Sequence, residues 1–163
     1  MRPIKTILAT ALAIAFAAAA FAQAPQSLIL EFVDGDNLDV VYPDSTVYSY
    51  ATGSVMEGDA IPIGAMVKTG ADTSVELRLK PNGTVVKLAK MTSFRVDGLA
   101  TPQKDQNAFT IASGKIRAVA AKGSQYTIYT STTVAGVRGT DFSMSFEEGA
   151  KAMLLVAKGR VEF

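Results

Sequence analysis

The chain has 163 residues, with 16 Lys or Arg against 15 Asp or Glu, and it contains neither histidine nor cysteine. Ordinary zinc sites need His or Cys ligands, and Ser-His-Asp or Cys-His nucleophile systems need histidine, so the composition excludes these chemistries together with disulfide bonds. The nearly balanced charge argues against nucleic acid as a partner, and we expect no cofactor, no metal and no catalytic residues.

The first 22 residues have the order of a helical secretory signal peptide. Residues 1–5 form a basic head, an apolar run follows from Ile7 to Ala22, and the run ends in the small-x-small sequence Ala20-Phe21-Ala22. Because the run is alanine-rich and short for a span of about 20 residues, a retained anchor is the less favoured alternative. We expect cleavage after Ala22 and a periplasmic, cell-surface or secreted protein that is no lipoprotein and keeps no stable membrane span.

Residues 23–57 are predicted to form an acidic β segment that packs on a main domain of residues 58–163. The stretch from Gln23 to Asp59 carries seven acidic residues and no Lys or Arg, whereas the rest of the mature chain is net positive. A partner surface or mutual docking of the two portions would explain this contrast, but ordinary solvated faces explain it more simply.

The same segment contains a run of oxygen-bearing side chains, and Asp34, Asp36, Asn37 and Asp39 are spaced as at the start of a calcium-binding loop. The glycine and glutamate required later in such a loop are absent, so a polar turn is expected.

Alternation of apolar and polar residues with period two predicts strands after this segment. Val75, Leu77 and Leu79 alternate with charged residues, and Pro81-Asn82-Gly83 predicts a hairpin turn into the next strand. Residues 93–97 and 141–146 alternate in the same way.

The remaining connections follow from polar and glycine-containing stretches. Residues 100–107 are expected to be an exposed connection, and Glu148-Gly149 and Lys158-Gly159 are expected to be tight turns. Many short strands with frequent turns predict an all-β single domain of antiparallel strands, in a sandwich, roll or jelly-roll-like arrangement.

Several segments stand in the order typical of FecR domains, and on them the chain resembles that family. Residues 64–70 resemble its "Gly-Asp-x-Ile-x-Thr-Gly" motif, and residues 133–142 resemble its "Thr-x-Ala-x-x-Gly-Val-Arg-Gly-Thr-x-Phe" motif in compact form. A hairpin with a central glycine lies between them, and a closing "Val-x-x-Gly-x-Val" follows. The resemblance assigns these positions to the family motif, in a structural role: Gly64, Thr69, Gly70, Gly83, Ala135, Gly136, Val137, Arg138, Gly139, Thr140, Asp141, Phe142 and Gly159.

The resemblance implies an exported FecR-like module that binds or senses at the cell envelope without catalysis, with an envelope protein or cell-wall glycan as partner. The best-known FecR proteins relay a signal from an outer-membrane receptor to a sigma factor. Here Ala65 replaces the usual Asp, and the few residues before the apolar run leave no room for a cytoplasmic sigma-binding segment. A regulator in such a relay is therefore the first alternative, and a small carbohydrate-active enzyme with a carboxylate pair is the second.

Three groups of side chains have both a functional and a structural explanation. Arg138 and Asp141 would suit a ligand pair, although charges that bond nearby backbone at a glycine bend are the simpler interpretation. Arg78, Lys80 and Lys87 are predicted to share the outer face of one hairpin, where they would meet an anionic glycan or serve solubility. Tyrosines 42, 48 and 50 are typical of a sugar platform and equally of ordinary strands.

Overall fold

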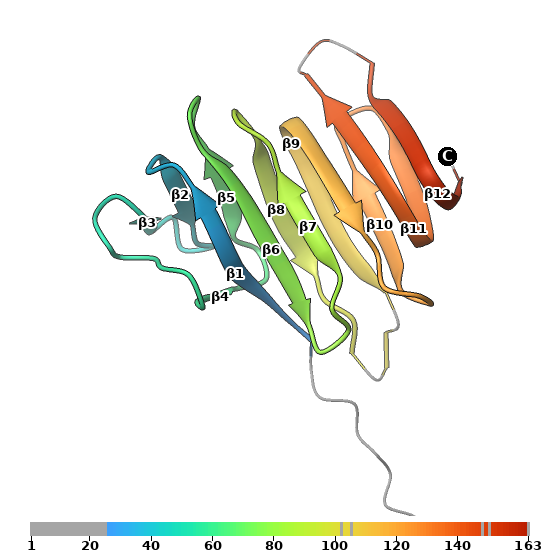
Figure 1. Ribbon diagram of the computed structural model, residues 1–163, viewed down its shortest axis with the longest axis horizontal. Coiled ribbons are helices and arrows are strands. Elements are labelled where there is room, and N and C mark those ends of the chain that lie inside the picture. Colours follow the sequence, from blue (N-terminus) through green and yellow to red (C-terminus); the bar gives the residue numbers. More distant parts are fainter. Residues whose placement is uncertain (1–25, 102, 105, 148, 150, 163) are drawn as a thin grey trace, which may run out of the picture.

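The structure is a computed structural model that describes residues 26–101, 103–104, 106–147, 149 and 151–162, so the predicted signal peptide lies outside the described residues. The described residues form twelve strands and no helix, which confirms the all-β prediction (Figure 1). Accordingly, no helix in this part of the chain could cross a bilayer. The strands are β1 (Ser27–Asp34), β2 (Leu38–Val41), β3 (Val47–Ser49), β4 (Ala60–Ile61), β5 (Met66–Thr69), β6 (Ser74–Lys80), β7 (Val85–Leu88), β8 (Ser93–Gly98), β9 (Asn107–Val119), β10 (Gln125–Tyr129), β11 (Val134–Phe146) and β12 (Met153–Glu162).

All twelve strands belong to one sheet that curls into two layers. Its main path has the order β3-β2-β5-β8-β9-β7-β6-β1-β4, and β10, β11 and β12 continue it beyond β9. In Figure 1, β1, β6 and β7 lie in front of β2, β5 and β8. We call these two sets the front layer and the rear layer. The acidic segment supplies β1 to β3. β1 pairs with β6 in the front layer and β2 pairs with β5 in the rear layer, so the segment contributes to both layers.

A sharp bend in β9 joins the two layers. Ser113 is the last residue of β9 that pairs with β8 in the rear layer, and Gly114 is the first that pairs with β11. Gly114 has φ of +97°, and a Cβ atom at this position would lie 2.5 Å from the Cα of Thr92. Glycine is required here by both the backbone conformation and the close approach, because L side chains disfavour positive φ.

Among the last three strands, β11 also changes partner, pairing with β10 in its first half and with β9 in its second half. β10 runs parallel to the first half of β9, which departs from the predicted antiparallel pattern. This is possible because the chain leaves β9 in the front layer and returns to the rear layer before β10 starts. β12 follows β11 along both halves. The predicted turn at Lys158-Gly159 is wrong, because both residues lie inside β12 opposite the bend of β11.

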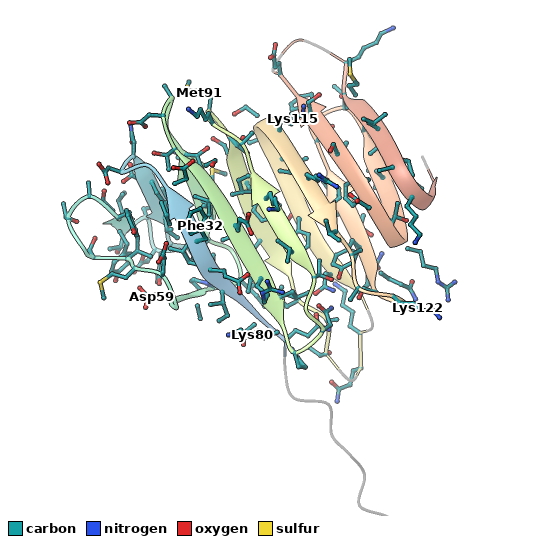
Figure 2. The ribbon with its side chains drawn as sticks, in the orientation of Figure 1. Phe32, Asp59, Lys80, Met91, Lys115 and Lys122 are labelled. Carbon is teal, nitrogen blue, oxygen red and sulfur yellow. The ribbon has the colours of Figure 1, made fainter. Side chains whose placement is uncertain are left out.

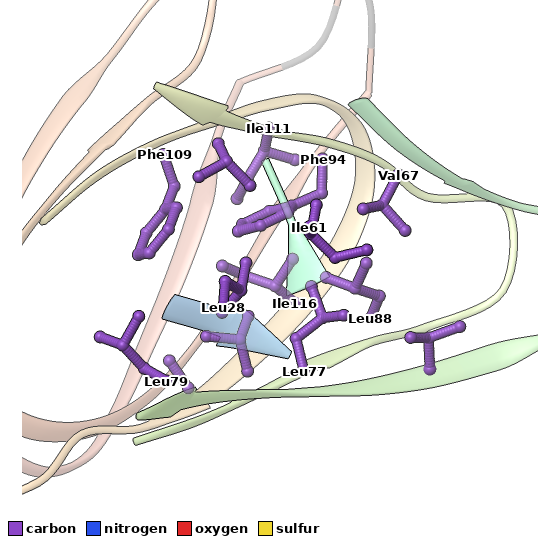
Figure 3. Close-up of a cluster of buried hydrophobic side chains, with 14 of the residues drawn as sticks. Leu28, Ile61, Val67, Leu77, Leu79, Leu88, Phe94, Phe109, Ile111 and Ile116 are labelled. Carbon is purple, nitrogen blue, oxygen red and sulfur yellow. The ribbon is translucent and has the colours of Figure 1, made fainter. Parts of the chain in front are cut away.

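The core fills the space between the layers and follows the predicted alternation. Leu77 and Leu79 from the front layer meet Phe94 and Phe109 from the rear layer, and the two phenylalanine rings are 5.1 Å apart between centroids (Figure 3). These side chains are fully buried, and each contributes about 1.5–3 kcal/mol by leaving water. The hairpin turn between β6 and β7 is confirmed, with φ of +81° at Gly83.

The connection between β8 and β9 is less exposed than the sequence predicts. Ala100 and Asn107 at its two ends are buried, and the Ala100 N–H donates to Oδ1 of Asn107 over 2.9 Å. A buried amide needs such a partner, and Asn107 supplies it because it starts β9 beneath the loop. The exposed positions of the connection lie between these two anchors.

Candidate functional site

The second half of the predicted family motif lies at the bend of β11. Gly139 has φ of +56°, and its N–H donates to the Ser124 carbonyl over 3.0 Å. The Thr140 hydroxyl donates to the Arg138 carbonyl over 2.9 Å, and Thr140 is fully buried. Ala135, Val137 and Phe142 are buried in the core on either side of the bend, and Gly136 pairs with β10 and β12. These positions lie along β11 on both sides of its bend.

Asp141 pairs with Arg117 of β9. Asp141 receives two hydrogen bonds from the Arg117 guanidinium, over 3.1 and 2.9 Å. These bonds hold the pKa of the Asp141 carboxyl below its usual value. The Arg138 side chain is exposed and, within the described residues, makes no ion pair. The charged pair that ties β9 to β11 is thus Arg117–Asp141.

The first half of the motif surrounds the ends of β5. Gly64 has φ of +88°, and its N–H donates to the Val96 carbonyl over 2.6 Å. The Thr69 hydroxyl donates to the Ala89 carbonyl over 2.7 Å and accepts from the Thr92 N–H over 2.9 Å. A Cβ atom on Gly70 would lie 2.4 Å from the Asn37 side chain. Gly159 lies within β12, and Gly83 forms the hairpin turn described above.

A groove on the outer face of the rear layer lies away from these motif positions. Its floor consists of Ala108, Thr110 and Ala112, which are every second residue of β9 and therefore point to the same side of the sheet. Their short side chains leave a channel between the larger side chains of β8 and β10. We call the two sides of this channel its banks. The groove has a volume of about 780 Å³, within the range of ligand sites.

The bank formed by β8 is a fixed polar network. Nε of Arg95 donates to Oδ1 of Asp97 over 2.6 Å, and the Thr110 hydroxyl donates to Oδ2 of the same carboxylate over 2.6 Å. Arg95 also donates to the Thr110 hydroxyl over 3.4 Å. Both carboxylate oxygens are therefore engaged, and the three side chains hold one another in place across β8 and β9.

The opposite bank is formed by Tyr129 and by the turn after β10. Tyr129 pairs with Thr110 in the parallel ladder and is 40% exposed. The Thr130 hydroxyl accepts the N–H groups of the next turn residues and fixes the turn, so that Ser131 stands at the rim. Buried Ile111 and Phe146 close the inner end, where β9 changes its partner from β10 to β11.

Three polar groups around the groove are free to meet a ligand. Within the described residues, the Lys104 ammonium, the Tyr129 hydroxyl and the Ser131 hydroxyl make no hydrogen bond and no ion pair. Among the described residues of the lining, Asp97 is the single carboxylate. In the part of the chain that the structure describes, no three His, Cys, Asp or Glu side chains gather as metal ligands. The arrangement can bind and orient a polar ligand.

Two of the three cations predicted on the hairpin face have partners within the protein. Arg78 donates to Glu31 over 2.5 Å and Lys87 bonds Glu76, so two cations of the hairpin face are neutralised. Lys80 lies at the end of β6 (Figure 2).

The tyrosines of the predicted sugar platform pack against one another and against the core. The rings of Tyr42 and Tyr48 are 4.4 Å apart between centroids, and both tyrosines, together with Tyr50, pack partly buried against the core. Burial is the main cause that raises the pKa of Tyr42, with a smaller contribution from Tyr48.

Sequence reasoning overlooked the groove. Its floor has a recognisable pattern, because small residues occupy every second position of Ala108-Phe109-Thr110-Ile111-Ala112 while the intervening residues are large and apolar. A strand with one large and one small face predicts a hollow on the small side. Which side chains form the banks depends on the strand order, and the parallel neighbour β10 was not predictable from local signals.

Comparison with known proteins gives one match. The family model described as FecR protein matches residues 65–162, which include the groove and most of the motif positions. Neither a curated protein nor a solved structure matches the chain.

Proposed function

Because the chain belongs to the FecR protein family, we propose that it is an exported module of the cell envelope that binds a ligand as part of a sensing or regulatory system and catalyses no reaction. The groove on the outer face of β8, β9 and β10 is the binding surface in this proposal. The family suggests a periplasmic regulatory or sensing role, and the predicted signal peptide agrees with that location.

The observation that carries the proposal is the build of the groove. Its floor consists of small residues, the side chains of one bank are held by hydrogen bonds to one another, and further polar groups around the groove are available to a ligand. The network of Arg95, Asp97 and Thr110 is preorganised, so that a ligand meets side chains already held in position. Lys104 and Tyr129 offer unused polar groups beside it. Preorganised side chains next to free donors favour recognition of a ligand. Asp97 is the one carboxylate among the described lining residues, which argues against acid–base hydrolysis in this groove.

The experiment replaces a floor residue with one that fills the groove. The exposed Ala112 points into it, and phenylalanine is well tolerated in strands, so Ala112→Phe blocks the groove while leaving the fold intact. The matched control is Lys115→Gln, an exposed position on β9 beyond the bend. A strain that lacks the gene is complemented with wild type, Ala112→Phe or the control.

The transcript profile of each strain is the measurement. We expect Ala112→Phe to reproduce the profile of the deletion and the control to restore that of the wild type. A profile restored by Ala112→Phe contradicts a sensing role for the groove. Hydrolysis of cell-wall glycan by the purified protein would contradict the non-catalytic role.

The sigma-factor relay is the second candidate, and membership of the FecR family favours it. In a relay, the transcripts that change in the deletion strain are confined to the genes of one sigma factor. Removing that sigma factor should then abolish the difference between the wild type and Ala112→Phe. If the transcript profiles of the wild type and Ala112→Phe still differ whichever sigma factor is removed, the relay is excluded and the broader sensing role remains.

A further inference from the structure

We propose that the groove on β8, β9 and β10 binds a short linear glycan that carries carboxylate groups. This inference rests on the proposed function, because it names the ligand class of the same groove.

The backbone of the groove cannot recognise an extended peptide. β9 pairs with β8 on one side and with β10 on the other, so the ladders use the backbone N–H and C=O groups along most of the floor. A peptide that binds as a strand needs a free edge for its own backbone hydrogen bonds. On the face of a sheet whose strands are already paired, the backbone N–H and C=O groups of the peptide would lose their water without gaining hydrogen-bond partners. Recognition on this face has to come from side chains, which suits a glycan.

The side chains around the groove match a sugar. Tyr129 offers a half-exposed aromatic ring, on which the apolar face of a sugar ring can stack. The free hydroxyls of Tyr129 and Ser131 and the ammonium of Lys104 can donate to sugar oxygens. The floor extends from Ala108 to Ala112, four residue steps of about 3.3 Å or about 13 Å in all, which accommodates a chain of a few rings.

The charge of the lining favours an acidic sugar. Among the described lining residues, Arg95 and Lys104 stand beside one carboxylate, Asp97, which the Arg95 guanidinium already pairs. Lys104 therefore remains a cation without an anion among the described residues. A carboxylate of the ligand would be the anion that pairs with Lys104, through a charge-assisted hydrogen bond that salt weakens.

The test titrates the protein, purified from the envelope, with trigalacturonate as an acidic linear glycan and with maltotriose as a neutral one. Calorimetry is the readout. We expect trigalacturonate to bind more tightly than maltotriose, and the preference to shrink as the salt concentration rises. Lys104→Gln should remove the preference, whereas Lys115→Gln should leave it unchanged.

Two further variants test the place of binding. Ala112→Phe should abolish binding, and Tyr129→Ala should weaken it by about tenfold, since aromatic contacts contribute on this scale. The matched aromatic control is Phe32→Ala on the outer face of the front layer, where Phe32 is half-exposed (Figure 2). Thermal unfolding shows whether each variant is folded, so that loss of binding is not mistaken for loss of structure.

Failure of this inference is distinguishable from failure of the proposed function. No binding of either glycan up to about 10 mM, equal binding of both, or binding that survives Ala112→Phe overturns the acidic-glycan proposal. If Ala112→Phe still reproduces the deletion profile in cells, the groove keeps its sensing role and its ligand belongs to another class. If Ala112→Phe changes neither binding nor the profile, both proposals fall.

Discussion

The bend of β9 gives the sharpest prediction about the fold. Gly114 connects the two layers, and alanine there would face two separate penalties. The first is the positive φ of +97°, and the second is the contact of its Cβ with Thr92, at 2.5 Å from both Cα and Oγ1. The backbone Cα cannot move away as a flexible side chain would, so Gly114→Ala should displace the β7–β8 connection or straighten β9.

Gly123→Ala separates these two penalties. Gly123 has φ of +84°, but a Cβ atom there would meet nothing within 4 Å. Both variants lose about 1–2 kcal/mol from the unfavourable backbone conformation. Gly114→Ala should lose about 1–3 kcal/mol more from overpacking, which is a large part of the roughly 5–15 kcal/mol that stabilises a typical domain.

Urea denaturation of the two variants and the wild type measures the difference. The reasoning predicts that Gly114→Ala has a clearly lower midpoint than Gly123→Ala at a similar slope. Free energies of unfolding that agree within about 0.5 kcal/mol would refute it, because the close approach to Thr92 would then carry no cost.

Three further predictions follow from the core, from an ion pair and from the leader. Leu77→Asp should unfold much of the protein in urea denaturation, because Leu77 is fully buried, whereas Arg78→Asp on the outer face should be mild, and equal effects would contradict the alternation. The lowered pKa of Asp141 means that its pairing with Arg117 stabilises the fold above the ordinary carboxyl pKa of about 4 and is lost as the pH falls. A double-mutant cycle of Asp141→Asn and Arg117→Gln should therefore show coupling near neutral pH that declines as the pH falls below about 4, and coupling that stays constant in increasing acid would contradict the assignment. N-terminal sequencing of the protein from the envelope should start at Gln23, and a start at Met1 would overturn the predicted cleavage.

The predictable part of the fold rests on local patterns. Alternation around Leu77 and around Phe94 gave the strands and their buried faces, because side chains change sides at each residue whatever the neighbouring strand is. The turn at Gly83 was predictable for the same reason, since turn residues act within a few positions. Lys158-Gly159 shows the limit of this reasoning, because a glycine can also serve a bend inside a long strand.

The arrangement of the strands depended on information that a local pattern does not contain. The parallel pairing of β10 with β9 and the partner changes of β9 and β11 arise from contacts between distant segments. The groove exists only because this pairing sets Tyr129 opposite Arg95 and Asp97. Motif residues such as Arg138 attracted attention in the sequence, whereas the structure assigns that region to the bend of β11.

Backbone amide NMR of the labelled protein, titrated with trigalacturonate, tests the central claim most directly. The account predicts that shifts concentrate on the floor from Ala108 to Ala112 and on Tyr129, and that β1 and β6 in the front layer stay unchanged. Shifts centred on the front layer, or a spectrum unchanged by the glycan, would contradict the claim that this groove is the binding surface.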